Sequence, residues 1–178
     1  MKAAAGLFSA LCLMAVLLMA GAAFYFWAPL PPPELPPIVG TADRIIIEKS
    51  ARVMRLMQNG QTVRTYRVAL GFAPDGDKSQ QGDGRTPEGT FGIAVRNDAS
   101  KYHLSLGLDY PQADDRARAV AGGFDPGGDI MIHGQPNALP DGTIIKGDWT
   151  AGCIAVSNAE MREIWAVTDR DTVVEIRP

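Results

Sequence analysis

The chain has 178 residues and a formal net charge of −3, with 17 basic and 20 acidic side chains interspersed along it. A nucleic-acid-binding surface needs basic residues clustered on one face, and the sequence shows no such cluster, so we expect no nucleic-acid partner. The length suits one domain with appended segments.

The N-terminal segment, residues 1–28, is mainly apolar and carries one charge, at Lys2. Its uncharged stretch, Ala3 to Ala28, exceeds the ~20 residues that a membrane-spanning helix needs. We therefore predict a single-pass anchor in the inner (cytoplasmic) membrane, with Lys2 in the cytoplasm and the rest of the chain in the periplasm. The run Ala20-Gly21-Ala22 also fits a signal-peptide cleavage site, which would instead give a secreted protein.

A proline-rich segment follows at residues 29–42. Six of the nine residues from Pro29 to Pro37 are proline. Such a composition favours an extended polyproline II conformation, which rises roughly 3.1 Å per residue and behaves as a semi-rigid spacer. We predict a linker that holds the following domain close to the membrane.

From residue 43 to residue 178 the pattern is mostly that of β-strands. Two such runs flank Asn59-Gly60, the strongest short signal for a hairpin turn because both residues tolerate positive φ. The segment Gly71–Gly89 is rich in glycine, aspartate and proline and predicts a long functional loop. The predicted strands are Arg44–Glu48, Arg52–Gln58, Gln61–Leu70, Phe91–Val95, His103–Leu108, Ile130–His133, Ile154–Val156 and Val173–Arg177.

One helix is expected near the C-terminus. Ser157 and Glu160 form a capping-box pair, and Met161, Ile164 and Trp165 follow at helical spacing. Together with the strands, this predicts a mainly-β domain with a small helical complement.

One thiol and one imidazole carry the predicted chemistry. Cys12 lies in the predicted membrane segment, so Cys153 is an unpaired thiol in the exported part. His133 ends one predicted strand and Cys153 opens the next. A cysteine attacks as its thiolate, and a nearby imidazole can supply that state. We predict that Cys153 is the nucleophile and His133 the proton donor and acceptor; a buried, inert cysteine is the alternative.

Glycine and small residues precede Cys153 and indicate a tight, open turn. Gly152 lets the main chain approach a substrate closely, and the amides of Gly152 and Cys153 are expected to donate to the oxyanion of a tetrahedral intermediate. A third group should orient His133, and a backbone carbonyl would serve as well as a side chain. The residues expected to line the substrate cleft are Tyr102, His103, Gly134, Trp149, Thr150 and Ala151.

His103 is the only other histidine, and we expect it to be structural or cleft-lining rather than the base. Two histidines and one cysteine could supply three zinc ligands, but the close His-x3-His or Cys-x2-Cys spacing is missing. Residues Gly82–Pro87 lack the glycine spacing and the lysine of a phosphate-binding loop. We therefore expect neither a metal nor a cofactor.

Together these motifs resemble the L,D-transpeptidase catalytic-domain (YkuD-type) family. The family signature is His-Gly followed, after a mid-teens gap, by Ser/Thr-x-Gly-Cys; here it reads His133-Gly134, fifteen residues, and Thr150-Ala151-Gly152-Cys153. Gly84–Phe91 resembles the Thr-Pro-x-Gly-x-Phe element of the family, and Gly128–Gly134 resembles its strand into the histidine. The resemblance covers about residues 43–178 and implies a β-sandwich or open barrel.

By this resemblance, Cys153 attacks a peptidoglycan tetrapeptide stem after its third residue and releases the terminal D-alanine. The acyl-enzyme then passes the stem to an amine acceptor, giving a 3→3 cross-link or an attached protein in cell-wall biogenesis. Some relatives use water, so a carboxypeptidase or endopeptidase is an alternative, and a non-catalytic wall-binding module is another. Many relatives carry His or Arg in place of Ala151 and Arg in place of Ala155, which leaves carboxylate recognition and the acceptor open.

Overall fold

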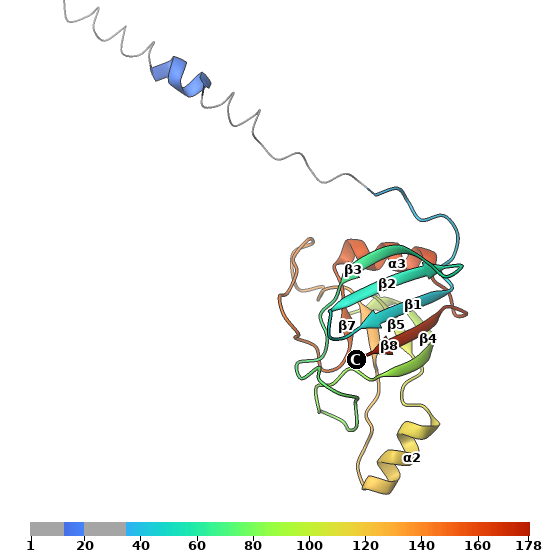
Figure 1. Cartoon of the computed structure of the whole chain (residues 1–178). Coiled ribbons are helices and arrows are strands. Elements are labelled where there is room, and N and C mark those ends of the chain that lie inside the picture. Colours follow the sequence, from blue (N-terminus) through green and yellow to red (C-terminus); the bar gives the residue numbers. More distant parts are fainter. Residues whose placement is uncertain (1–12, 20–34) are drawn as a thin grey trace, which may run out of the picture. The chain divides into compact units, whose positions relative to one another are not determined.

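The computed structural model describes residues 13–19 and 35–178 (Figure 1). Of the predicted membrane segment it describes only a helical stretch at residues 13–19, and the rest of residues 1–28 lies outside the described part, as do residues 29–34 of the predicted linker. Among the described residues, no helix is long and apolar enough to cross a membrane. Residues 38–178 form one compact unit.

Within this unit, eight strands form one curled sheet in the order β3-β2-β1-β8-β4-β5-β6-β7 (Figure 1). Most neighbours are antiparallel, but β1 pairs with β8, and β6 with β7, in parallel. The two ends of the sheet approach each other where the amides of Ala69 and Ala155 each donate to the other's carbonyl, at 2.9 and 2.8 Å. The predicted mainly-β fold is thereby confirmed, and of the two expected arrangements, a β-sandwich or an open barrel, the curled open sheet agrees with the second. The strands are β1 (Arg44–Glu48), β2 (Val53–Gln58), β3 (Gln61–Arg67), β4 (Gly89–Ser100), β5 (His103–Leu108), β6 (Met131–His133), β7 (Ile154–Ala155) and β8 (Val173–Arg177).

Alternating burial explains why the central segments are strands. In β1, Ile45 and Ile47 are buried and the residues between and beside them are only half-buried. The observed bounds of β1, β5 and β8 match the predicted ones. At the predicted hairpin, Asn59 and Gly60 have φ values of 51° and 76°, the left-handed conformation that such a turn needs.

Strand β4 is much longer than the predicted segment Phe91–Val95. Its register against β5 shifts between Ile93 and Val95 and again between Asn97 and Ser100. Bulges of this kind keep a polar segment paired although its apolar alternation breaks, so the prediction ended the strand too early.

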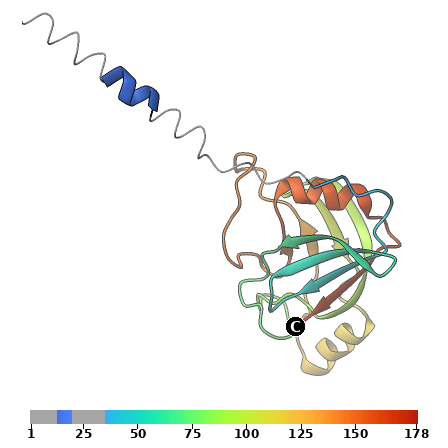
Figure 2. The same cartoon turned by 45° about the horizontal axis from the view of Figure 1, so that its top comes forward.

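Two helices accompany the sheet. In α3 (Asn158–Val167) the Ser157 hydroxyl accepts from the Glu160 amide at 3.2 Å and the Glu160 carboxylate accepts from the Ser157 amide at 2.8 Å, which confirms the capping box. Helix α2 (Ala113–Gly122) was not predicted, because Ala119 is its only buried residue and its sequence shows no apolar stripe. The helices lie at opposite ends of the domain (Figure 2).

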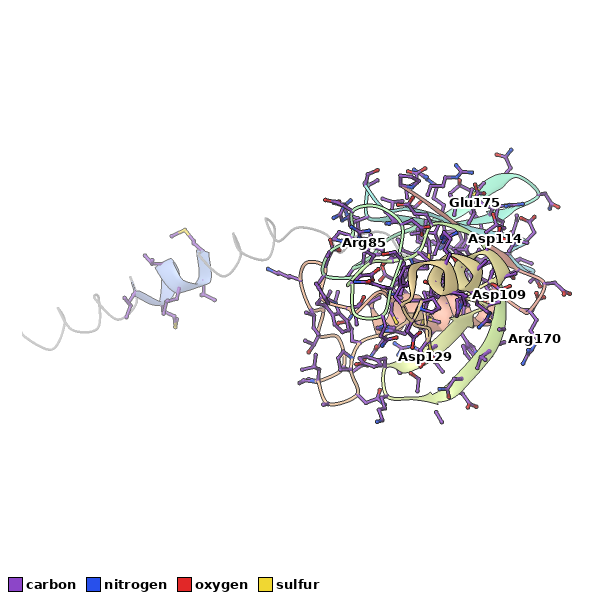
Figure 3. The ribbon with its side chains drawn as sticks, turned by 90° about the horizontal axis from the view of Figure 1, so that it is seen from below. Arg85, Asp109, Asp114, Asp129, Arg170 and Glu175 are labelled. Carbon is purple, nitrogen blue, oxygen red and sulfur yellow. The ribbon has the colours of Figure 1, made fainter. Side chains whose placement is uncertain are left out.

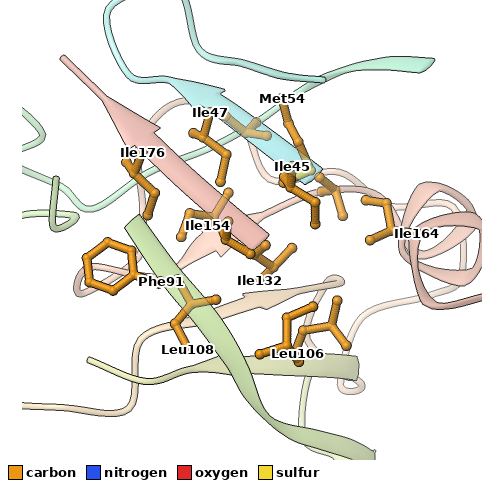
Figure 4. Packing of buried hydrophobic residues seen from close by; sticks show 14 of the residues in the cluster. Ile45, Ile47, Met54, Phe91, Leu106, Leu108, Ile132, Ile154, Ile164 and Ile176 are labelled. Atoms are coloured by element: carbon orange, nitrogen blue, oxygen red, sulfur yellow. The ribbon is translucent and has the colours of Figure 1, made fainter. Parts of the chain in front are cut away.

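The core fixes the two strands that carry the predicted catalytic residues. Ile132 on β6 and Ile154 on β7 are directly paired, and both are fully buried (Figure 4). Burying an isoleucine side chain contributes about 1.5–3 kcal/mol. His133 follows Ile132 and Cys153 precedes Ile154, so the packing of the two isoleucines determines where the imidazole and the thiol lie.

Candidate active site

The structure brings His133 and Cys153 to one cavity. The parallel pairing of Ile132 with Ile154 puts Cys153 opposite Met131, and residues 131 and 133 share a face of the sheet because side chains alternate along a strand. The imidazole and the thiol therefore lie diagonally on one face. Both border a cavity of about 580 Å³, and Cys153 is only half-buried.

His133 is held in one orientation by its own backbone. Its Nδ1 lies 2.7 Å from the carbonyl oxygen of Gly134. A carbonyl only accepts hydrogen bonds, so we assign the proton of the neutral ring to Nδ1, which leaves Nε2 free to accept one. The orienting group left open by the sequence is thus a backbone carbonyl, one of the two kinds considered.

Aromatic rings enclose the imidazole. The centroid of the Tyr102 ring lies 4.6 Å from that of His133, and the Trp149 centroid lies 5.8 Å away at an interplanar angle of 67°. Only 4% of His133 is exposed. This burial lowers the pKa of His133, partly offset by the hydrogen bond to Gly134, so the ring is neutral near pH 7 and able to act as a base.

The thiol is protonated in the resting state. Burial raises the pKa of Cys153, and the backbone of Met131 opposes this effect. Of the nearby charges, the Asp129 carboxylate raises that pKa further and the Lys78 ammonium lowers it. The sulfur lies 3.4 Å from the carbonyl oxygen of Asp129. A thiol of this kind needs a base to become a nucleophile.

The turn before Cys153 requires glycine at position 152. Gly152 has a φ of 139°, and a Cβ there would lie 2.7 Å from the carbonyl oxygen of Arg85. The Gly152 amide donates to the Thr150 hydroxyl at 3.1 Å, and that hydroxyl donates to the Cys153 carbonyl at 2.8 Å. Thr150 therefore braces the turn. The Cys153 amide forms no hydrogen bond with residues 13–19 or 35–178 and can donate to a substrate oxygen.

The other predicted cleft residues divide into two groups. Tyr102, Trp149, Thr150 and Ala151 border the cavity together with the pair. Gly134 does not border it; a Cβ there would lie 2.6 Å from Oδ1 of Asn158, so glycine allows close packing instead. His103 also does not border it.

The His103 ring lies instead beside helix α3. Its Nε2 is 3.3 Å from a guanidinium nitrogen of Arg162. Of the two roles predicted for His103, structural or cleft-lining, this position favours the structural one.

Several cavity residues were not predicted from the sequence. Ser100, Ser105, Asp129 and Met131 also border the cavity. Ser105 pairs directly with His133, and its buried hydroxyl, like the buried Trp149 indole nitrogen, has no hydrogen-bond partner within the described part of the chain. The alternating strand pattern predicts on which face of the sheet Ser105 lies, but nothing in the sequence predicts that it pairs with His133. Among the described residues, no group of three His, Cys, Asp or Glu side chains could hold a metal ion.

Comparison with known proteins identifies relatives of this domain. The sequence matches the YkuD family, described as the L,D-transpeptidase catalytic domain, over residues 42–176. It is 27% identical over 135 residues to the Escherichia coli (strain K12) protein named "Putative L,D-transpeptidase YafK", covering 72% of this chain and 48% of that protein. The chain thus spans about half the length of the curated relatives it matches.

Solved structures share the fold. Pgp2 from Campylobacter jejuni, described as a helical cell shape determining protein, matches with a TM-score of 0.60 and 24% identity over 78% of this chain and 48% of that chain. An L,D-transpeptidase from Xylanimonas cellulosilytica matches with a TM-score of 0.51 and 17% identity over 89% and 69%. At these identities the likeness concerns the fold alone.

Proposed function

Because the chain belongs to the L,D-transpeptidase catalytic-domain family, we propose that it is a peptidoglycan L,D-transpeptidase with Cys153 as nucleophile and His133 as base. One observation carries the proposal: the two side chains lie on one face of paired strands and border a common cavity. The free Nε2 of the neutral imidazole supports the role of His133.

In the first half-reaction, Nε2 of His133 takes the thiol proton as the sulfur attacks the carbonyl carbon of the third stem residue. The Cys153 amide, with the Gly152 amide if Thr150 releases it, stabilises the oxyanion. The C–N bond then breaks, and the imidazolium returns its proton to the amine of the departing D-alanine. The stem is left as a thioester on Cys153.

In the second half-reaction, an amine attacks the thioester and the thiol is restored. With the side-chain amine of another stem, the product is a 3→3 cross-link; with a lysine of a protein, it is an attached protein. Water in place of the amine would make the enzyme a carboxypeptidase. The cell-shape description of Pgp2 supports a role in cell-wall biogenesis.

We propose further that the domain works in the periplasm, attached to the inner membrane by residues 1–28. The motivation is the long uncharged stretch of the sequence after Lys2. Cell fractionation of the full-length protein tests this location: recovery with the inner membrane supports it, and recovery in the cytoplasm contradicts it.

Purified disaccharide-tetrapeptide, incubated with the full-length protein and analysed by mass spectrometry, tests the activity. We expect cross-linked dimers from the wild type, none from Cys153→Ala, and few from His133→Ala. His103→Ala is the matched control, since that ring does not border the cavity, and should keep most activity. Tripeptide products without dimers would show that the enzyme is a hydrolase. Full activity of a folded Cys153→Ala protein would show that Cys153 is not the nucleophile.

A further inference from the structure

Cys153 borders a second cavity as well as the one that contains His133. The second cavity has a volume of about 270 Å³ and shares Asp129, Ala151 and Cys153 with the first. His133 does not border it, but Lys78 does. A group bound there would lie beside the sulfur, in a position separate from the base.

Lys78 provides a buried positive charge in the second cavity. Its side chain is 3% exposed, and its ammonium donates to the Gln80 carbonyl at 3.1 Å and to the Asp83 carboxylate at 2.7 Å. An ammonium has three N–H donors, so one is left for a ligand.

Asp83 pairs with Lys78, but three backbone amides share its carboxylate. Its two carboxylate oxygens also accept hydrogen bonds from the amides of Ser79, Gln80 and Arg85, at 2.8, 3.1 and 3.0 Å. Burial opposes ionisation of Asp83, but Lys78 and these three amides outweigh it and hold the pKa of Asp83 well below its usual range, so the carboxylate charge is shared among four donors. The remaining donor of Lys78 is therefore suited to a carboxylate.

Asp129 provides the opposite charge in the same cavity. Asp129, labelled in Figure 3, is exposed, and its carboxylate forms no hydrogen bond or ion pair with the described residues. Its backbone carbonyl contacts the Cys153 sulfur. A carboxylate at this point would repel a purely anionic ligand. Ala151, which also borders the cavity, adds no charge. The cavity thus offers one cationic and one anionic group to its ligand.

We propose that this cavity binds the head group of an α-amino acid, with its carboxylate on Lys78 and its ammonium on Asp129. The proposal rests on the proposed function and specifies its acceptor: an amine with a neighbouring carboxylate is bound beside the thioester. A lysine side chain of a protein has no such carboxylate and would not be selected. The D-alanine released in the first half-reaction carries the same head group and would occupy the same cavity.

The transfer step is balanced without a further reactant. The bound ammonium first loses one proton to solvent, and the neutral nitrogen attacks the thioester carbonyl carbon. The C–N bond forms and the C–S bond breaks. The second nitrogen proton passes to the departing sulfur, which restores the Cys153 thiol.

Ligand-observed NMR on the full-length protein tests the site without requiring turnover. The ligands are D-alanine, D-alaninamide, which lacks the carboxylate, and N-acetyl-D-alanine, which lacks the ammonium. We expect D-alanine to bind at least about tenfold more tightly than either analogue, as for loss of a charge-assisted hydrogen bond. Equal affinity for all three ligands would overturn the proposal, whatever the activity of the enzyme.

Three variants assign the preference to residues. Lys78→Met should remove the preference over D-alaninamide, and Asp129→Asn should remove the preference over N-acetyl-D-alanine. Lys146→Met removes an exposed lysine that does not border this cavity and should keep both preferences. If Lys78→Met affects binding no more than Lys146→Met does, the assignment is wrong. Should Lys78→Met fail to fold, the exposed Asp129→Asn change still decides: retained preference over N-acetyl-D-alanine overturns the proposal.

The partition of the acyl-enzyme gives a second readout. The ratio of transfer product to hydrolysis product depends on the acceptor site and not on how fast the acyl-enzyme forms. For D-alanine as acceptor, Lys78→Met should lower this ratio at least about tenfold, with little change for D-alaninamide. An equal drop for both acceptors would contradict carboxylate recognition by Lys78, while absence of any acyl-enzyme in the wild type would instead remove the proposed function.

Discussion

Replacing His133 with alanine should leave the resting Cys153 thiol almost unchanged and still remove most acylation. Burial raises the pKa of the thiol and lowers the pKa of the imidazole, so the pair is neutral at pH 7. An ordinary thiol with a pKa of about 8.5 is roughly 3% thiolate at pH 7, and Cys153 should hold less. His133 then acts only when substrate is bound, and loss of a general base lowers the rate by about 10²–10⁴-fold.

Two assays on the same variants separate these effects. Alkylation of Cys153 by iodoacetamide, read by peptide mass spectrometry because Cys12 is also present, reports the thiolate. The alkylation rate should rise with pH through the neutral range in both the wild type and His133→Ala. The rate of acylation by a tetrapeptide should be much lower in His133→Ala than in the wild type. Because the lowered pKa keeps the ring neutral, wild-type acylation should decline only below about pH 6.5.

Two results together would refute this reasoning: rapid, pH-independent alkylation of the wild type in mildly acidic buffer, and loss of that rapid alkylation in His133→Ala. Such a result would reveal a preformed thiolate–imidazolium pair. His103→Ala, the other histidine variant, should behave as wild type in both assays.

Further predictions concern the turn and the strands that position the pair. Gly152→Ala places a Cβ 2.7 Å from a backbone oxygen at a φ of 139°. We therefore expect the free energy of unfolding in urea to fall by about 1–3 kcal/mol and acylation to slow. A urea midpoint equal to that of the wild type would show that alanine is not strained at this position. Thr150→Val removes the hydroxyl that joins the Gly152 amide to the Cys153 carbonyl and should cost about 1–3 kcal/mol, with Thr150→Ser restoring stability. Ile132→Ala should cost about 2–5 kcal/mol, measured against Ile144→Ala at a site 60% exposed; equal effects would show that Ile132 does not anchor β6.

The sequence predicts most of the sheet because local signals and burial agree there. Strands β1, β5 and β8 have matching predicted bounds, and the Asn59-Gly60 turn is set by two residues that adopt positive φ. Helix α2 could not be found in this way, since it buries only Ala119. The far half of β4 depends on bulged pairing with β5, a long-range feature that leaves no apolar alternation.

The candidate site shows the same division. The spacing of His133 and Cys153 on successive strand signals predicts that they meet, and both do border one cavity. Ser105 and Lys78 are different: each reaches the site through tertiary structure, Ser105 by its register against β6 and Lys78 by the hydrogen bonds that fold its loop around Asp83. Neither the register of two strands nor the closure of a loop can be predicted from a local sequence pattern.

The most direct test of the catalytic assignment is peptide mapping of the full-length protein after incubation with purified disaccharide-tetrapeptide. We predict an adduct equal to the substrate minus its terminal D-alanine, carried by Cys153 and missing from Cys153→Ala. An adduct on another residue, or cross-linking by a folded protein that never carries the adduct on Cys153, would contradict a covalent role for this cysteine.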